Sequence, residues 1–317
     1  MSTPPGGSRV TPRARFLLRL VFGICLLVLI LSRVGLPTLR RGLGPETLAG
    51  VFGAATLLLS SQAIAALRWK LIMGQGSPPW GYLARLYIIG GFFSLFLPTL
   101  VGGDAVRALA AARENSRPGG VVASVLLDRA MGMFAIVCYG LLGAALAPEF
   151  ALRLVEGARL KLPGTVLVLA GVGMIVAIVA AVWFARGSPR LREGLNDALR
   201  AVRDLARTPG SLLAAIALGF VVQGLYILLW LVLARAIHLP LAASTLLFAV
   251  PVVTAFAMLP ITLNGLGVRE GAWLLLLSGS GIPPSEIVTF SLLFFVTNLI
   301  TGLTGGLLFM VRGTSLN

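Results

Sequence analysis

Residues 97–104 have the sequence LPTLVGGD and interrupt an apolar stretch that runs from residue 82 to residue 114. Residues 259–267, LPITLNGLG, interrupt a second apolar stretch, from residue 242 to residue 280. Proline lacks a backbone donor, and clustered glycine favours non-helical backbone, so such clusters end a helix. Each stretch is therefore expected to form two short helices joined by a break.

The rest of the chain has the composition of a membrane protein. Hydrophobic residues make up 57% of its 317 residues and charged residues only 12%, against about 25% in soluble domains. A helix that spans a bilayer needs about 20 apolar residues. Runs near this length occupy residues 16–36, 46–67, 119–147, 165–185, 210–236 and 286–311. We therefore expect an all-α polytopic membrane protein with six full spans and two interrupted segments, eight hydrophobic segments in all.

The two interrupted segments belong to an internal repeat. Leu-Pro, a glycine and Val-Arg of the first break recur 162 residues later in the second. The same offset carries runs 46–67 and 119–147 onto later apolar runs, which predicts repeat units at 46–147 and 208–311. Irregular backbone at membrane depth is tolerated only inside protein or beside a watery cavity. We therefore predict two re-entrant hairpins, each within a helix–hairpin–helix unit.

Basic residues predict the orientation. The net charge is +15, which in a soluble chain would suggest nucleic acid, but these residues lie mostly between apolar segments. The side of the membrane that is richer in Arg and Lys usually faces the cytoplasm. We therefore expect the chain to lie in the cell (inner) membrane with both termini in the cytoplasm. The repeats are then inverted, as in many secondary transporters. Residues 1–15 are expected to be a disordered basic tail and residues 16–312 one domain. An interfacial basic helix at 188–207 would contact anionic headgroups.

Charged residues at membrane depth are costly and indicate function. In the first break, Asp104 and Arg107 are three residues apart and share a helix face. Gly102 and Gly103 allow another group to approach closely. The new helix presents free N–H groups, which suit an anion such as a phosphate headgroup. Asp104 would cap this helix or orient the ligand.

Asp128 and Arg129 lie within run 119–147, and neighbours on a helix point in different directions. They are therefore expected to pair with residues elsewhere, Asp128 with Arg107 and Arg129 with Asp104. Arg68, at a predicted cytoplasmic helix end, is expected to be mainly a snorkelling membrane anchor.

The second break carries the matching set, Asn264, Gly265, Gly267, Arg269 and Glu270. Arg269 has the geometry to bind a phosphate through two hydrogen bonds, and Glu270 would hold Arg269 or titrate. An alternative interpretation of all three groups is a buried ion-pair network that locks the hairpins into the bundle. The two interpretations are compatible.

The remaining reactive residues suggest no cofactor. Cys25 and Cys138 lie in apolar runs and are expected to be small buried hydrophobes, and His238 ends a span. The sequence has no zinc, haem or P-loop pattern. We expect no metal site, no cofactor and no catalytic residue.

These motifs, in this order, resemble the flippase-like transmembrane domain of lysylphosphatidylglycerol synthases. They are Leu97-Pro98 with Gly102-Gly103-Asp104 and Arg107, then Asp128-Arg129 with Gly132, and then Pro260 with Gly265, Gly267, Arg269, Glu270 and Gly271. The resemblance covers nearly the whole chain after the N-terminal tail. Some members also carry a soluble aminoacyl-transfer domain, which we do not expect after the last run of this chain. The resemblance implies lipid handling rather than the synthase reaction.

The leading hypothesis is a lipid translocator. It would move an anionic, aminoacylated or polyprenyl-linked lipid between leaflets through a polar cavity where the hairpins meet. Arg107, Arg129 and Arg269 would contact phosphate, and the carboxylates would position them. Two alternatives stay open. One is a membrane enzyme that acts on lipid headgroups, with Asp104 and Glu270 as acid and base. The other is a non-transporting partner of an envelope glycosyltransferase complex. Oligomers are compatible with each.

Overall fold

The structure, a computed structural model, describes most of the chain. It covers residues 44–74, 76–96, 102–113, 118–157, 207–258 and 262–312, with residues 196, 199, 200 and 203. Several predictions therefore lie outside the described residues: the tail 1–15, the runs 16–36 and 165–185, most of helix 188–207, and Leu97, Pro98 and Pro260 themselves.

All regular structure in the described residues is helical. In chain order the helices are α3 (Pro45–Met73), α4 (Trp80–Phe96), α5 (Gly102–Arg113), α6 (Pro118–Leu146), α7 (Pro148–Gly157), α10 (Pro209–Ala236), α11 (Ala243–Ala257), the 3-10 turn η1 (Leu263–Gly265), α12 (Val268–Leu276) and α13 (Pro284–Arg312). Proline stands at the start of the four longest ones, where its missing N–H has no helical partner to lose. Four helices are long and apolar enough to cross a membrane, Pro45–Met73, Gly120–Leu146, Pro209–Ala236 and Pro284–Val311. They confirm four of the predicted runs.

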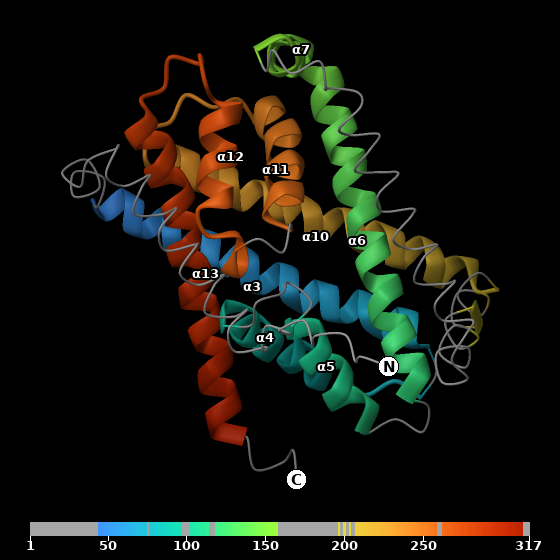
Figure 1. Ribbon diagram of the computed structural model, residues 1–317. Helices are drawn as coiled ribbons and strands as arrows, with labels where there is room; N and C mark the ends of the chain where they lie inside the picture. The colour runs from blue at the N-terminus through green and yellow to red at the C-terminus, as the bar shows by residue number, and fades with distance from the viewer. Residues whose placement is uncertain are drawn as a thin grey trace, which may run out of the picture.

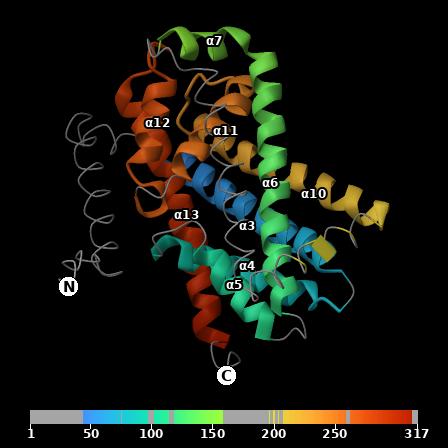
Figure 2. The ribbon, with the colours of Figure 1, turned by 45° about the vertical axis from the view of Figure 1, so that its right-hand side comes forward.

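The four long helices form the frame of the molecule. Helices α3 and α10 lie side by side and run across α6 and α13 in both views (Figures 1 and 2). The pair α4 and α5 lies on one side of α3 and α10, and α11 and α12 lie on the other. Gly50 makes the contact between α3 and α10 possible, because a Cβ there would lie 2.2 Å from the Cβ of Ala236.

Both predicted interruptions are present, since α4 ends at Phe96 and α11 at Ala257. Helix α5 folds back against α4, where a Cβ on Gly103 would lie 2.2 Å from the carbonyl oxygen of Gly90. The second break turns through left-handed backbone at Asn264, Gly265 and Gly267. The second helix of each pair begins at Gly102 and at Val268.

The two halves pack on each other reciprocally. Helix α4 contacts α13 of the other half, and α11 contacts α6. Both contacts depend on paired glycines, Gly140 and Gly143 on α6, and Gly302 and Gly305 on α13, which are related by the same offset of 162 residues. A Cβ on Gly143 would lie 2.3 Å from a backbone nitrogen of α11, and one on Gly305 would lie 2.2 Å from a carbonyl oxygen of α4. At these two contacts, the offset of 162 residues relates one glycine pair to the other.

The sequence analysis missed helix α7. Pro148 starts it directly after α6. The backbone hydrogen bonding continues across the junction, since the N–H of Ala151 donates to the carbonyl oxygen of Ala147 at 3.1 Å. It turns away from α6 (Figure 1) and packs Phe150 edge-on against Phe248 of α11, with ring centroids 6.1 Å apart. The predicted run 119–147 ends directly before α7, and no element was predicted at residues 148–157.

We expect Gly305→Ala to lower the thermal unfolding temperature of the detergent-purified protein, because the added methyl group meets backbone that cannot move aside. Overpacking of this kind costs about 1–3 kcal/mol. Gly271→Ala is the matched control, since a Cβ there has nothing within 4 Å. Equal unfolding temperatures for the two variants would contradict the close approach of α4 and α13.

Candidate functional site

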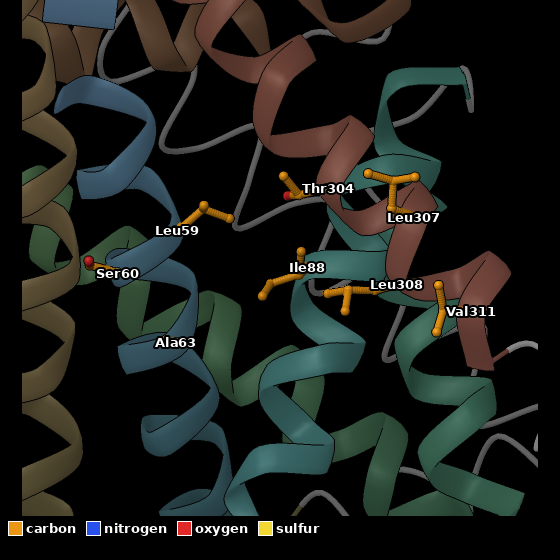
Figure 3. A pocket seen from close by; sticks show the side chains of 8 residues that line it. All are labelled: Leu59, Ser60, Ala63, Ile88, Thr304, Leu307, Leu308 and Val311. Atoms are coloured by element: carbon orange, nitrogen blue, oxygen red, sulfur yellow. The ribbon is translucent and has the colours of Figure 1, made fainter. Parts of the chain in front are cut away.

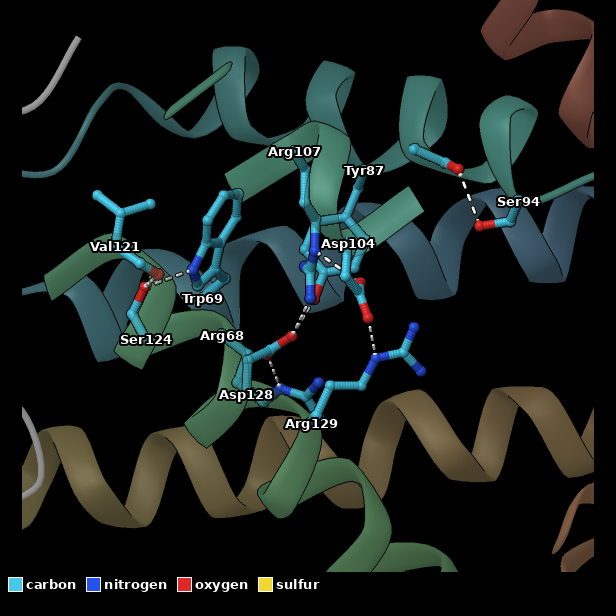
Figure 4. A network of polar contacts seen from close by, with 11 residues as sticks. Arg68, Trp69, Tyr87, Ser94, Asp104, Arg107, Val121, Ser124, Asp128 and Arg129 are labelled. Carbon is cyan, nitrogen blue, oxygen red and sulfur yellow. Dashed lines mark hydrogen bonds and ion pairs between the residues drawn. The ribbon is translucent and has the colours of Figure 1, made fainter. Parts of the chain in front are cut away.

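A buried carboxylate, Asp128 of α6, is the centre of the site (Figure 4). Its Oδ1 accepts a hydrogen bond from Nε of Arg68 at 2.7 Å. Its Oδ2 accepts one from Nη2 of Arg107 at 3.1 Å and another from the hydroxyl of Tyr87. The side chain is 1% exposed. The predicted pairing of Asp128 with Arg107 is confirmed, and the centre joins α3, α4, α5 and α6.

A second carboxylate, Asp104, extends this network toward the surface. Its Oδ1 forms an ion pair with Nε of Arg107 at 2.9 Å, one turn along α5. Its Oδ2 accepts a hydrogen bond from Nε of Arg129, whose side chain is 46% exposed. The predicted pair of Arg129 with Asp104 is confirmed. Asp104 thus bridges α5 to α6, and the Arg129 guanidinium stands at the rim.

The prediction that Arg68 is mainly a snorkelling anchor is wrong. Helix α3 continues to Met73 instead of ending near residue 67, so Arg68 lies inside the helix and is only 4% exposed. Its guanidinium packs beside two glycines, since Cβ atoms on Gly132 and Gly219 would lie at ordinary contact distances of 3.6 and 3.5 Å from Nη1. The sequence carries little sign of this position, because Arg68 stands at the edge of its apolar run.

Arg107 is enclosed on its remaining sides by aromatic rings. Its guanidinium carbon lies 4.0 Å from the ring centroid of Tyr87 and 4.9 Å from that of Trp69. Rings attract a cation through their negative faces. Trp69 is itself fixed, because its Nε1 donates to Ser124 of α6 at 2.8 Å. The guanidinium of Arg107 is thus surrounded by two carboxylates and two aromatic rings of the same chain.

Arg269, at the second break, has quite different surroundings. It is 5% exposed, its Nη2 donates to the carbonyl oxygen of Asn264 at 3.0 Å, and its guanidinium lies 4.6 Å from the ring centroid of Phe294. Within the described part of the chain it forms no ion pair with a carboxylate. Its positive charge is therefore balanced there only by a carbonyl dipole and a ring.

The expectation that Glu270 holds Arg269 is also wrong. The Glu270 carboxylate is fully buried and accepts hydrogen bonds from the backbone N–H of Gly267 at 2.6 Å and from the hydroxyl of Ser291 at 2.8 Å. It thereby closes the N-terminus of α12 and ties that helix to α13. A carboxylate in the first turn of a helix stabilises it in this way.

The turn that presents Arg269 depends on its glycines. Asn264, Gly265 and Gly267 have φ angles of 50°, 71° and 81°, a region in which side chains with a Cβ are strained. A Cβ on Gly265 would also lie 2.9 Å from the Cβ of Ala257. The turn η1 packs against α4 of the other half, so the second break lies beside the first pair of short helices.

The two halves use equivalent positions differently. At the offset of 162 residues, Arg68 corresponds to Trp230 and Asp128 corresponds to Phe290. Trp230 packs on Phe290 with ring centroids 5.0 Å apart and stacks on Phe294 at 4.4 Å. Where the first half has an ion-pair centre, the second half has an aromatic one, beside which Arg269 lies.

The described residues contain no group of three or more metal-ligating side chains. Cys138 is a free, partly buried thiol. His238 lies at the surface and pairs with Glu46 at 2.9 Å.

The fold and the site define a polytopic helical membrane protein with buried arginines at two helix breaks. A family model described as the lysylphosphatidylglycerol synthase TM region matches residues 16–306. The chain belongs to that family, as the resemblance in its motifs indicated. Comparison with the curated proteins and with the solved structures gives no match.

Replacing Asp128 with Asn should destabilise the protein strongly, because two buried guanidinium groups lose their shared counter-charge. Breaking a buried ion pair from one side costs about 3–5 kcal/mol. The measurement is thermal unfolding in detergent. Glu46→Gln is the control, since its ion pair is exposed and such pairs contribute about 0–1 kcal/mol. An Asp128→Asn protein as stable as Glu46→Gln would show that the network does not hold the helices together.

Proposed function

We propose that the chain is a lipid translocator, which moves a lipid with an anionic phosphate between the leaflets of the cell membrane. The observation that carries this proposal is Arg269, a buried arginine at a helix break without a carboxylate partner among the described residues. A charge in such surroundings is costly until an opposite charge reaches it. A lipid phosphate supplies that charge, and the planar guanidinium binds it through two parallel hydrogen bonds.

The membrane arrangement that fits this role is an inverted repeat. In it α4 with α5, and α11 with α12, are re-entrant hairpins that enter from opposite sides, within six full spans that include runs 16–36 and 165–185. Both termini are cytoplasmic. The reciprocal contacts of α4 with α13 and of α11 with α6, and the contact of η1 with α4, support this arrangement. Such hairpins bring polar groups to the middle of a bilayer, where alternating access operates.

The two halves then have separate roles. The network of Asp104, Arg107 and Asp128 is largely neutralised from within, so it fixes the first hairpin in the bundle. Arg129 stands at its rim, with a partly exposed guanidinium next to the path of a headgroup. Asn264, Gly265 and Gly267 shape the turn that presents Arg269, and Gly102 and Gly103 shape the first hairpin.

In this proposal the lipid is moved without covalent change, and the chain is not an enzyme. The internal contacts of Asp104 and Glu270 favour this view, because both carboxylates already accept hydrogen bonds from the protein. No cofactor is needed, and the substrate lipid is the partner.

Arg269→Ala should slow the transfer of fluorescent phosphatidylglycerol between leaflets of reconstituted vesicles by about ten- to a hundredfold. Hydrogen bonds to charged groups contribute about 1.5–3 kcal/mol, and about 1.4 kcal/mol corresponds to tenfold. Arg235→Ala is the matched control, since Arg235 is exposed at the end of α10. Transfer at the wild-type rate by Arg269→Ala would refute the proposal. Unfolding curves of both variants exclude loss of the fold as the cause.

The inverted arrangement predicts opposite accessibility for the two interhelical loops that follow α3 and α12. We expect a membrane-impermeant maleimide to label Ser278→Cys in intact cells and to label Pro79→Cys only after lysis. Both changes are made in a chain whose Cys25 and Cys138 are serine. Labelling of the two positions from the same side would rule out inverted hairpins.

A further inference from the structure

Glu270 of α12 is a fully buried carboxylate that forms no ion pair with the described residues. Its two oxygens accept hydrogen bonds from neutral donors, the backbone N–H of Gly267 and the hydroxyl of Ser291. A buried carboxyl group without a cation beside it favours the neutral, protonated form. The surroundings of Glu270 are therefore those of a group that binds a proton.

Ser291 has the chemistry to serve Glu270 in both protonation states. While the carboxylate is ionised, the hydroxyl of Ser291 donates to its Oε1 at 2.8 Å. A hydroxyl is also an acceptor, so a proton on Oε1 can be donated to Oγ of Ser291. The serine hydroxyl then turns to the carbonyl oxygen of Ile287, four residues earlier in α13. The N–H of Gly267 donates to Oε2 in either state. Both states of Glu270 thus keep their hydrogen bonds.

The titratable side chains of the helices around α12 lie away from Glu270. Helix α11 carries none. The others in the described part of these helices are Glu286 and Arg312 at the two ends of α13, and Tyr226 and Arg235 on α10, and none of them hydrogen-bonds to Glu270. Farther along, α13 lines an apolar groove with α3 and α4, and the residues that line it include no ionisable side chain (Figure 3). The charged side chain next to Glu270 is therefore that of Arg269.

The net charge of this region changes when a phosphate binds. Arg269 and Glu270 are neighbours, with Cα atoms about 3.8 Å apart, and their opposite charges cancel. A lipid phosphodiester at Arg269 adds one negative charge, which nothing in this pair offsets. Charges within about 10 Å of each other are only weakly screened where water and salt are excluded. One proton on Glu270 restores neutrality.

We propose that Glu270 takes up a proton when the lipid phosphate binds at Arg269, so that a proton is the second ligand of this site and moves with the lipid. The position of the phosphate rests on the proposed function. The proton comes from water and adds to a carboxylate oxygen, and no other bond forms or breaks. The coupling is reciprocal and does not depend on the route of the proton, because linkage is an equilibrium property. A proton gradient across the membrane would then drive the lipid in one direction.

The test is equilibrium binding of dihexanoyl phosphatidylglycerol to the detergent-purified chain at constant ionic strength. The measurements cover about pH 5 to 9, the range in which buried carboxyl groups titrate. The phosphodiester of the lipid stays ionised throughout. We expect the dissociation constant to rise with pH by up to about tenfold per pH unit, the limit for one linked proton.

Three variants identify the group that binds the proton. Glu270→Gln should bind the lipid at every pH as tightly as the wild type does at low pH, because glutamine is neutral and still accepts from Gly267. Ser291→Ala removes a donor to the ionised carboxylate, so it should move the midpoint of the pH dependence to higher pH. Glu286→Gln, in the first turn of α13, is the matched control and should keep the wild-type profile. Thermal unfolding curves show whether each variant is folded.

A dissociation constant that does not change with pH overturns the inference, even where transport depends on Arg269 and the proposed function stands. A pH dependence that Glu270→Gln retains overturns it as well. Where Glu270→Gln loses all binding, Ser291→Ala decides, since a shifted midpoint supports the inference and an unshifted one overturns it.

A pH dependence that Glu270→Gln removes supports the inference, even where the chain moves no lipid and the proposed function fails. A wild-type chain that binds no phosphatidylglycerol at any pH contradicts both.

Discussion

A charged side chain buried inside a membrane protein needs an opposite charge beside it, and in this chain the buried carboxylate of Asp128 is such a side chain. A single carboxylate cannot be left alone in surroundings of low dielectric constant. It is met by Arg68 of α3 and Arg107 of α5, while Tyr87 of α4 donates to it as well. Three helices must therefore converge on α6. Gly132 packs beside the Arg68 guanidinium there.

The second half has the same helical frame, but its equivalent positions carry aromatic residues instead of this ion-pair centre. The reciprocal contacts through Gly143 and Gly305 show that the backbones of the two halves pack alike. Yet Trp230 and Phe290 occupy the places of Arg68 and Asp128. Aromatic stacking holds helices together without ionised groups. Among the described residues, the arginine of the second half, Arg269, therefore contacts a ring and a carbonyl instead of a carboxylate. One frame thus supports an ion-pair centre in the first half and an aromatic centre in the second.

The sequence predicted the parts of this structure that follow from local pattern. Apolar run length located α3, α6, α10 and α13, and proline and glycine located the breaks after Phe96 and Ala257. The need of each charge at membrane depth for a partner on another helix predicted the pairs of Asp128 with Arg107 and of Asp104 with Arg129. The prediction failed where a tertiary contact decides the role of a residue. Arg68 lies at the edge of its apolar run, and only its hydrogen bond to Asp128 of another helix shows that it turns inward. Glu270 follows Arg269 directly, but neighbours on a helix point apart, and Ser291, distant in the sequence, is its partner.

The two short helices are tethered by different kinds of contact. Helix α5 is attached to α6 through both Asp104 and Asp128, so moving it separates opposite charges. Helix α12 is attached to α13 through the hydrogen bond from Ser291 to Glu270, through the ring of Phe294 beneath Arg269 and through the buried ring of Trp273. Breaking a buried ion pair from one side leaves an unpaired charge, whereas separating two rings leaves none. One helical frame thus holds its first short helix by charge pairing and its second by aromatic packing and a neutral donor.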